Sequence, residues 1–286
     1  MAYLRPEALV EPTWLAQQIE EGDVAVIDAS FHLPTAKRDP NIEFKASHIP
    51  GAVFFDINDI ADKSVDLPHM LPSPEIFNEE VGKLGISRNN HVVCYDTNGG
   101  AMAAMRAFWS FKVFGHEKVS VLNGGLTRWM VQGYEVESGQ PLIKPKVYKA
   151  NEFNKKLVRT LEQVIENLDS ETEQFVDVRS LGRYNSTEPE PRPGLRGGHL
   201  PRSINLPFQE MLQIDNHMAL KKAKDLETVI SNAGIDPSKP VISSCGSGVT
   251  AAVLYFSLHL LGFDTAAIYD GSWTEWGSRK DTPVVQ

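Results

Sequence analysis

The chain has 286 residues, of which 42% are hydrophobic and 23% charged, and its net charge is −9 at pH 7. This length and composition suit two globular domains, and the acidic balance argues against a general nucleic-acid binder or a binder of anionic membranes. Two cysteines are too few for a disulfide scaffold or a zinc site, and no apolar run is long enough to span a bilayer, so we expect a cytoplasmic protein without membrane partners.

The first half of the chain alternates predicted helices and strands. We expect a helix opening at residues 11–15 with Thr13 as its N-cap, a strand at 24–28, a polar loop over 31–47 and a turn at 48–52 leading into a second strand. Further along we expect a helix that Ser73-Pro74 begins and Leu84-Gly85 ends, a strand at 91–96, a helix to Phe114-Gly115, a strand at 118–122 and a helix around Trp129.

The same order of elements recurs in the second half. Val26-Ile-Asp28 is echoed at 175–177, Ser47-His-Ile-Pro50 at 198–201, the capped helix at Asp225–Gly234, and 122–129 at 269–276. The pairs Trp129/Trp276 and Asn98/Cys245 are both 147 residues apart. We therefore predict two tandem α/β domains, each a mainly parallel sheet flanked by helices on both faces, over residues 1–138 and 157–286 with a linker at 139–156.

One stretch of the second domain predicts chemistry. Residues 240–256 have the pattern of a buried strand, a glycine-rich loop that opens on Cys245, and a helix from Thr250. Gly246 and Gly248 permit backbone conformations that other residues resist. Unpaired N–H groups and the helix dipole favour an anion at such a place, so Cys245 is interpreted as a nucleophilic thiolate. The alternative for a lone thiol is a buried structural cysteine, which is our interpretation of Cys94.

The repeat and its motifs resemble the tandem-rhodanese sulfurtransferases over nearly the whole chain. The motifs are His48-Ile-Pro-Gly-Ala52, His69-Met-Leu-Pro72, Asp177-Val-Arg179, Glu188-Pro-Glu-Pro-Arg192, Gly198-His-Leu-Pro201, Cys245-Gly-Ser-Gly-Val-Thr250 and Tyr269-Asp-Gly-Ser-Trp273. The resemblance implies an inactive first domain, with Asn98 at the nucleophile position, and an active second domain. It also implies transfer of a sulfane sulfur through a persulfide on Cys245, without a metal or an organic cofactor.

The loop after the cysteine distinguishes two branches of this family. Thiosulfate sulfurtransferases usually carry Arg-Lys where this chain has Gly246 and Ser247, and the loop here is similar to that of 3-mercaptopyruvate sulfurtransferases. The resemblance places Arg183 and Arg192 at carboxylate-binding positions, a role that the planar guanidinium suits. It places the loop residues against the substrate as well: Gly246, Gly248, Val249 and Thr250.

A proton-transfer group is also implied by the resemblance. Ser247 matches a serine proposed to act with a histidine and an aspartate of the first domain, and the histidine position is His69. The aspartate position holds Asn58, which can orient an imidazole but cannot stabilise an imidazolium as a carboxylate does. The expected partners are a small sulfur donor and a thiol acceptor such as thioredoxin, or cyanide.

Other readings of the sequence remain open at this point. The nearest is a thiosulfate:cyanide sulfurtransferase, and a non-catalytic sulfur-carrier or regulatory binding module is the rival outside the enzymes. A cysteine phosphatase is disfavoured because Ala251 stands where such an enzyme needs a phosphate-binding arginine, six residues after the cysteine.

Overall fold

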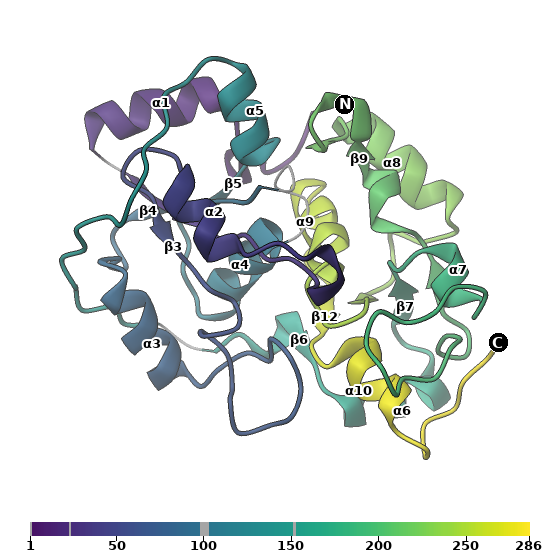
Figure 1. The fold of residues 1–286 in the computed structure, drawn as a ribbon. Coiled ribbons are helices and arrows are strands. Elements are labelled where there is room, and N and C mark those ends of the chain that lie inside the picture. The colour runs from purple at the N-terminus through teal and green to yellow at the C-terminus, as the bar shows by residue number, and fades with distance from the viewer. Residues whose placement is uncertain (1, 23, 98–102, 151–152) are drawn as a thin grey trace.

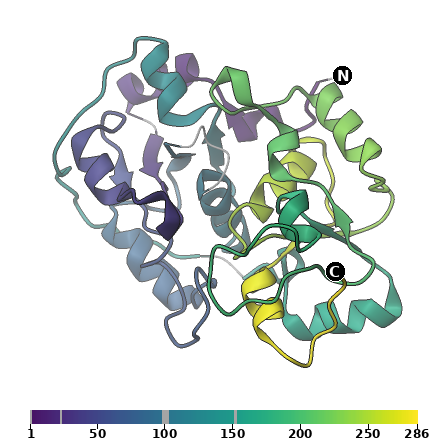
Figure 2. The same ribbon diagram turned by 45° about the vertical axis from the view of Figure 1, so that its right-hand side comes forward.

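The computed structural model describes residues 2–22, 24–97, 103–150 and 153–286. Two α/β domains lie side by side, the first coloured purple to teal and the second green to yellow in Figure 1, and they remain so after the turn to Figure 2. Each is built around a five-stranded sheet in which every neighbouring pair of strands is parallel. The predicted fold class is thus confirmed.

The first sheet has the order β1-β5-β4-β2-β3. In chain order its strands are β1 (Leu9–Val10), β2 (Val24–Asp28), β3 (Val53–Phe54), β4 (His91–Tyr95) and β5 (Val119–Leu122). The helices around it are α1 (Pro12–Glu21), α2 (Pro40–Ala46), α3 (Pro74–Lys83), α4 (Ala103–Val113) and α5 (Gly125–Val131), with 3-10 turns at Pro6–Ala8 and Pro34–Ala36.

The second sheet repeats this order as β6-β12-β11-β7-β8. Its strands are β6 (Val158–Arg159), β7 (Gln174–Asp177), β8 (Ile204–Asn205), β11 (Val241–Ser244) and β12 (Ala266–Tyr269), and β9 (Leu212–Gln213) forms an antiparallel hairpin with β10 (Ala219–Leu220). The helices are α6 (Leu161–Ser170), α7 (Leu181–Tyr184), α8 (Ala223–Asn232), α9 (Ala251–Leu260) and α10 (Ser272–Ser278), with 3-10 turns at Lys155–Leu157, Phe208–Met211 and Ile214–Asn216.

The structure corrects two predicted helix boundaries and adds one helix that the sequence did not predict. Part of the predicted loop over 31–47 is α2, whose first N–H groups are capped by the side chain of Asp39. Helix α1 begins at Pro12, so Thr13 lies inside the helix and is not its cap. Helix α8 begins at Ala223, before the predicted start at Asp225. The predicted start of α3 at Ser73-Pro74 is confirmed, with the Ser73 hydroxyl accepting from the N–H of Ile76.

The two domains share one apolar core, in which α4 packs against α9 between the sheets. Every residue of α9 except His259 is buried, which accounts for a helix that is apolar on all sides. The N-terminal segment extends the contact, because Leu4 donates its N–H to the carbonyl of Leu260 in the second domain. None of the helices in the described ranges has the length and apolar character needed to cross a membrane.

The segment predicted as a linker follows the surface of the first domain. Gly139 donates its N–H to the carbonyl of Lys45, Lys146 donates to Gly82, and Tyr148 is buried. These contacts tie the described part of the segment to the first domain, up to residue 150. The exact domain boundaries stay a prediction.

The register of the two sheets corrects the predicted equivalence of Asn98 and Cys245. Asp28 pairs with Tyr95 in the first sheet, as Asp177 pairs with Ser244 in the second. The next residue along the central strand is then Asp96 in one domain and Cys245 in the other. Their carbonyls accept equivalent bonds, from Leu126 and Trp273. The loop of the first domain is therefore two residues longer. The prediction missed this difference because it used the 147-residue offset between the helices that follow the two loops. Asn98 itself lies outside the described residues.

Candidate active site

Cys245 directly follows the central strand β11 and opens the loop into α9. Its side chain is almost fully buried. Its N–H donates to the Ser272 hydroxyl at 3.2 Å, and its carbonyl accepts from the N–H of Trp273 at 3.0 Å. The cysteine is therefore fixed by the turn that begins α10. Cys94, in contrast, lies inside β4 and is completely buried, as the sequence predicted, and burial raises the pKa of its thiol.

The loop leaves a run of backbone donors open. Within the described part of the chain, the N–H groups of residues 246–250 have no hydrogen-bond partner in the protein. They precede the first turn of α9, a helix of 10 residues whose dipole adds partial positive charge there. Such an arrangement is suited to hold a thiolate, a persulfide or a bound anion.

The two glycines of the loop serve different purposes. Gly248 has a φ of +75°, in the left-handed region that favours glycine, as predicted. Gly246 is not in that region, so the predicted reason does not apply to it. A Cβ at Gly246 would instead lie 3.0 Å from Nη2 of Arg183. Glycine at this position lets the guanidinium approach the loop backbone.

A cavity of about 400 Å³ opens beside the thiol. Its lining brings together most of the residues that the sequence singled out: Cys245, Gly246, Ser247, Val249, Thr250, Arg183 and Arg192. The first domain contributes Phe31, Leu33 and Thr35 to the wall. Neither His69 nor Gly248 lines the cavity. The site thus lies where the catalytic loop, the segment after β7 and the first domain meet.

The two predicted anion-binding arginines differ in their partners. Arg183 donates to the buried carboxylate of Glu190 at 2.6 Å. No carboxylate among the described residues pairs with Arg192, whose Nη2 lies 3.4 Å from Nε2 of His69. Burial lowers the pKa of Arg192, while the charges of Cys245 and Glu190 act in the opposite direction. Arg192 is therefore a half-buried cation beside the thiol cavity that no carboxylate of the described chain pairs with directly.

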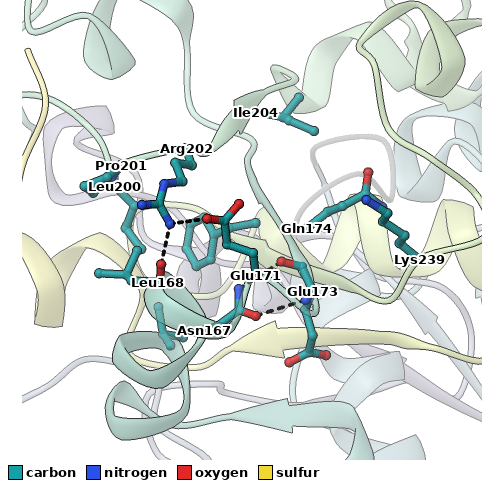
Figure 3. Close-up of a pocket in the computed structure, with 12 residues that line it drawn as sticks. Asn167, Leu168, Glu171, Glu173, Gln174, Leu200, Pro201, Arg202, Ile204 and Lys239 are labelled. Atoms are coloured by element: carbon teal, nitrogen blue, oxygen red, sulfur yellow. Dashed lines mark hydrogen bonds and ion pairs between the residues drawn. The ribbon is translucent and has the colours of Figure 1, made fainter.

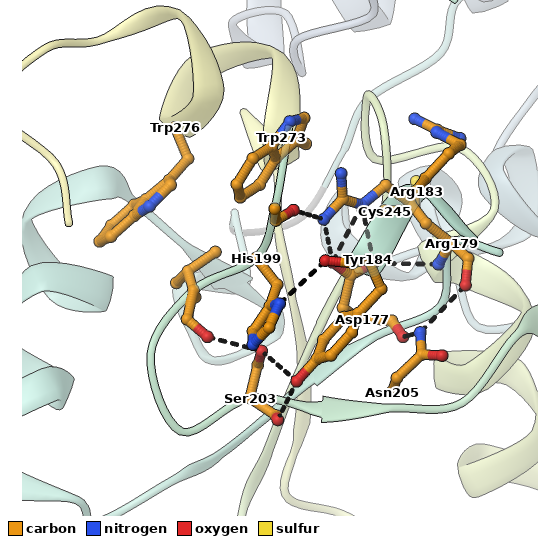
Figure 4. A network of polar contacts seen from close by, with 12 residues as sticks. Asp177, Arg179, Arg183, Tyr184, His199, Ser203, Asn205, Cys245, Trp273 and Trp276 are labelled. Carbon is orange, nitrogen blue, oxygen red and sulfur yellow. Dashed lines mark hydrogen bonds and ion pairs between the residues drawn. The ribbon is translucent and has the colours of Figure 1, made fainter. Parts of the chain in front are cut away.

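A buried network centred on Arg179 lies beside Arg183 (Figure 4). Arg179 donates to both carboxylate oxygens of Asp177, to Glu190 and to the carbonyl of Gly198, and it lies over the Trp273 ring at 4.1 Å. Glu190 is thus shared by Arg179 and Arg183. The motif Asp177-Val-Arg179 was visible in the sequence, but its pairing with Glu190 was not, because 11 residues separate the two partners.

Ser247, His69 and Asn58 are not joined as a triad. The Ser247 hydroxyl faces the cavity without a hydrogen-bond partner among the described residues. His69 packs edge-on against Phe31, and its buried Nδ1 has no hydrogen-bond partner in the described ranges. Asn58 donates to Asp56, and no hydrogen bond among the described residues joins it to the imidazole. Burial, with the charges of Arg106 and Arg192, lowers the pKa of His69 to about 3, so its ring is neutral near pH 7.

The two histidines that precede Ile-Pro and Leu-Pro have matching structural roles. His48 stacks on Phe44 and hydrogen-bonds the carbonyl of that residue, and His199 stacks on Tyr184 in the same way. Both rings are engaged within their own domain, away from the thiol cavity.

A second pocket, shown in Figure 3, lies at the start of β7. Its lining in the described chain has no cysteine, serine or histidine. Arg202 pairs there with Glu171, and the Glu173 carboxylate is taken by Arg159. Its charged groups are largely satisfied by one another, and we assign the chemistry to the cavity at Cys245.

Comparisons with known proteins agree with this arrangement. The Rhodanese-like domain family matches residues 11–132 and again 160–279. Thiosulfate sulfurtransferase of Rattus norvegicus is 42% identical over 278 residues, and 3-mercaptopyruvate sulfurtransferase of Homo sapiens is 39% identical over 277, each match covering 95% of this chain and 92% of the relative. The crystal structure of SseA from Escherichia coli, described as a 3-mercaptopyruvate sulfotransferase, superposes with a TM-score of 0.84 at 36% identity, covering 93% of this chain and 98% of that one.

Proposed function

The chain belongs to the rhodanese family and is a sulfurtransferase, and we propose that its sulfur donor is 3-mercaptopyruvate. The observation that carries this proposal is the distribution of charge around Cys245. The loop itself has no cation, whereas Arg192, which pairs with no carboxylate of the described chain, lines the same cavity. A donor whose carboxylate is remote from its sulfur fits this arrangement.

The first half-reaction transfers sulfur to the enzyme. The thiolate of Cys245 attacks the thiol sulfur of mercaptopyruvate, so that a sulfur–sulfur bond forms and the carbon–sulfur bond of the donor breaks. The electron pair of that bond passes to the methylene carbon as pyruvate enolate, which takes a proton and leaves as pyruvate. Arg192, with Arg183, holds the donor carboxylate and keto oxygen. The open N–H groups at 246–250 stabilise the persulfide.

Ser247 is the proposed proton donor to the enolate, and its hydroxyl takes a proton back from solvent once pyruvate has left. Its hydroxyl lines the cavity and is not engaged elsewhere in the described protein. His69 contributes indirectly, since its neutral ring lies beside Arg192 rather than in the cavity. This role is weaker than the direct part in proton transfer that the resemblance implied for His69.

The second half-reaction returns the enzyme to its starting state. The thiolate of an acceptor, such as thioredoxin or a small thiol, attacks the outer sulfur of the persulfide and leaves with it, which releases the Cys245 thiolate; cyanide takes the sulfur in the same way. Two separated half-reactions predict ping-pong kinetics. We place the activity in the cytoplasm, a proposal supported by two cysteines that are both free thiols.

Thiosulfate is the rival donor, and overall similarity does not separate the two, because relatives of both names are about equally identical to this chain. The test is the ratio of kcat/KM for mercaptopyruvate and thiosulfate, measured with cyanide as the common acceptor. We expect a clear preference for mercaptopyruvate. A preference for thiosulfate would overturn the proposed donor while leaving the sulfurtransferase assignment in place.

A further inference from the structure

One arginine of the first domain is buried against the catalytic loop of the second. Arg106 is a charged residue within the otherwise apolar first two turns of α4, and only 2% of it is exposed. Its guanidinium lies over the Trp109 ring at 4.3 Å. A buried charge is costly unless it is paired and hydrogen-bonded, so its partners indicate what it does.

The partners of Arg106 converge from both domains. It forms an ion pair with Asp270, at 2.7 Å, which follows the last strand of the second sheet. It donates to the carbonyl of Gly248 in the catalytic loop at 3.2 Å, and to the carbonyl of His69 at 2.5 Å. Asp270 in turn accepts the N–H of Leu71 at 2.8 Å. One guanidinium thus connects the catalytic loop to the segment that carries His69.

The approach is close enough to depend on Gly248. A Cβ at this position would lie 2.8 Å from Nη1 of Arg106 and 2.8 Å from the carbonyl of Asp270. Glycine is therefore required at position 248 for two reasons. Its backbone is in the left-handed region, and a side chain there would displace Arg106.

The internal repeat provides a comparison for this contact. The carbonyl of Arg106 accepts from Ser110, as that of Val253 accepts from Ser257, so Val253 is the counterpart of Arg106 on α9. Asn123 is the counterpart of Asp270: its side chain accepts the N–H of Leu220, at 3.1 Å, from the other domain. In both halves, the residue that follows the last strand of the sheet thus accepts a backbone N–H from the other domain. The charged pair stands on the side that contacts the loop of Cys245, and the repeat has valine and asparagine at the equivalent positions.

We infer that Arg106, held by Asp270, is a positioning residue for sulfur transfer. It fixes the Gly248 carbonyl, and through it the peptide units of residues 246–250 whose N–H groups face no protein partner. The first domain, which lacks a nucleophile at the equivalent position, thereby sets the geometry of the thiol loop in the second. The inference rests on the proposed role of Cys245 but not on the identity of the donor.

The test compares Arg106→Lys, Asp270→Asn and the double variant R106V/D270N. The double variant installs the residue types that the repeat has at the equivalent positions, Val253 and Asn123. Two rates are measured: single-turnover persulfide formation from mercaptopyruvate, and alkylation of Cys245 by iodoacetamide. We expect persulfide formation to slow about 10- to 100-fold in each variant, since small misplacements of reacting groups have effects of that size. KM should change little, because the donor-binding arginines belong to the second domain. Alkylation should slow in parallel.

The matched control is Arg5→Lys, which weakens a different contact between the domains. Arg5 pairs with Asp264 and donates to the carbonyl of His259, away from the catalytic loop. Arg5→Lys should lower the melting temperature without slowing either rate. Variants of Arg106 and Asp270 that lose only thermal stability, like Arg5→Lys, would overturn the inference. If wild type fails to take sulfur from mercaptopyruvate, the donor proposal fails, and the alkylation rates still decide the positioning role.

Discussion

The two domains place different residues at the same point of the same scaffold. Asp96 follows the central strand of the first sheet, and its carboxylate accepts the N–H of Ala104 at 2.9 Å, in the first turn of α4. Cys245 follows the central strand of the second sheet, where the N–H groups of 246–250 have no hydrogen-bond partner in the described part of the protein. The first domain thus binds its own side-chain anion at the helix N-terminus, and the second keeps this place available for a substrate or a persulfide.

The cations near the two loops differ in the same sense. In the first domain Arg38 donates two hydrogen bonds to the carboxylate of Glu43. In the second, Arg192 has no carboxylate partner among the described residues. The comparison teaches that the fold supplies a strand, a loop and a helix N-terminus in both halves. On our proposal, activity depends on open N–H donors and one arginine without a paired carboxylate next to a thiol.

The largest expected effect comes from removing the thiol. Cys245→Ser should abolish sulfur transfer, because a hydroxyl does not form a persulfide, and Cys245→Asp should do the same by reproducing the first domain. Both are assayed with mercaptopyruvate and cyanide, with circular dichroism as a check of folding. Cys94→Ser is the matched control and should retain activity, since its thiol is buried in β4. Appreciable transfer by Cys245→Ser would contradict the comparison.

The next effect separates the two arginines. Arg192→Ala should lower kcat/KM for mercaptopyruvate about 10- to 100-fold, which corresponds to losing one charge-assisted contact of about 1.5–3 kcal/mol. Arg183→Ala should cost less, because Glu190 already neutralises part of the charge of Arg183. Arg202→Ala, at the other end of the sheet, is the control and should leave kcat/KM unchanged. A larger loss for Arg183→Ala than for Arg192→Ala would show that the open charge is not the anchor.

A smaller effect concerns the choice of donor. The double variant G246R/S247K places two cations beside the thiol and removes the Ser247 hydroxyl, so the kcat/KM ratio should shift toward thiosulfate by about tenfold. Any side chain introduced in place of Gly246 must also displace Arg183, whose Nη2 would lie 3.0 Å from the added Cβ. This displacement further weakens binding of mercaptopyruvate. The charge component should diminish at high salt. An unchanged ratio would mean that the loop does not select the donor.

The smallest effect on catalysis is expected at His69, where the main consequence is for stability. Its pKa is about 3 in the folded protein, because of burial and nearby arginines, against about 6.5 when unfolded. As the pH falls below 6.5 the unfolded chain binds this proton first, so wild type should lose about 2 kcal/mol of folding stability by pH 5 through this group. His69→Asn should lack that loss in denaturant titrations at pH 7 and pH 5.

His259→Asn provides the comparison for that experiment. His259 is half-buried, and burial with the charge of Arg5 also lowers its pKa to about 3, but it lies away from the thiol cavity. Its replacement should remove a similar acid-dependent loss and leave kcat/KM unchanged. If His69→Asn retains the full wild-type loss of stability at pH 5, the imidazole is not held neutral.

Local sequence patterns predicted the parts of the molecule that depend on neighbours in the chain. The parallel sheets, the cap at Ser73, the core position of Cys94 and the loop that opens on Cys245 all follow from runs of a few residues. The equivalence of Asp96 and Cys245 did not, because a difference of two residues in loop length is invisible in the spacing of the helices. The Arg106–Asp270 pair was also missed, since it joins residues from different domains. A lone arginine in an apolar helix was the signal available for it.

The central claim is that the open loop of the second domain, and not its counterpart in the first, carries the sulfur. The most direct measurement is peptide mass spectrometry of the protein after incubation with mercaptopyruvate and no acceptor. The account predicts a gain of about 32 Da, one sulfur atom, on the peptide that contains Cys245, together with one pyruvate released for each enzyme molecule and no gain on the peptide of Cys94. Sulfur on Cys94, or pyruvate release without any sulfur on Cys245, would contradict it.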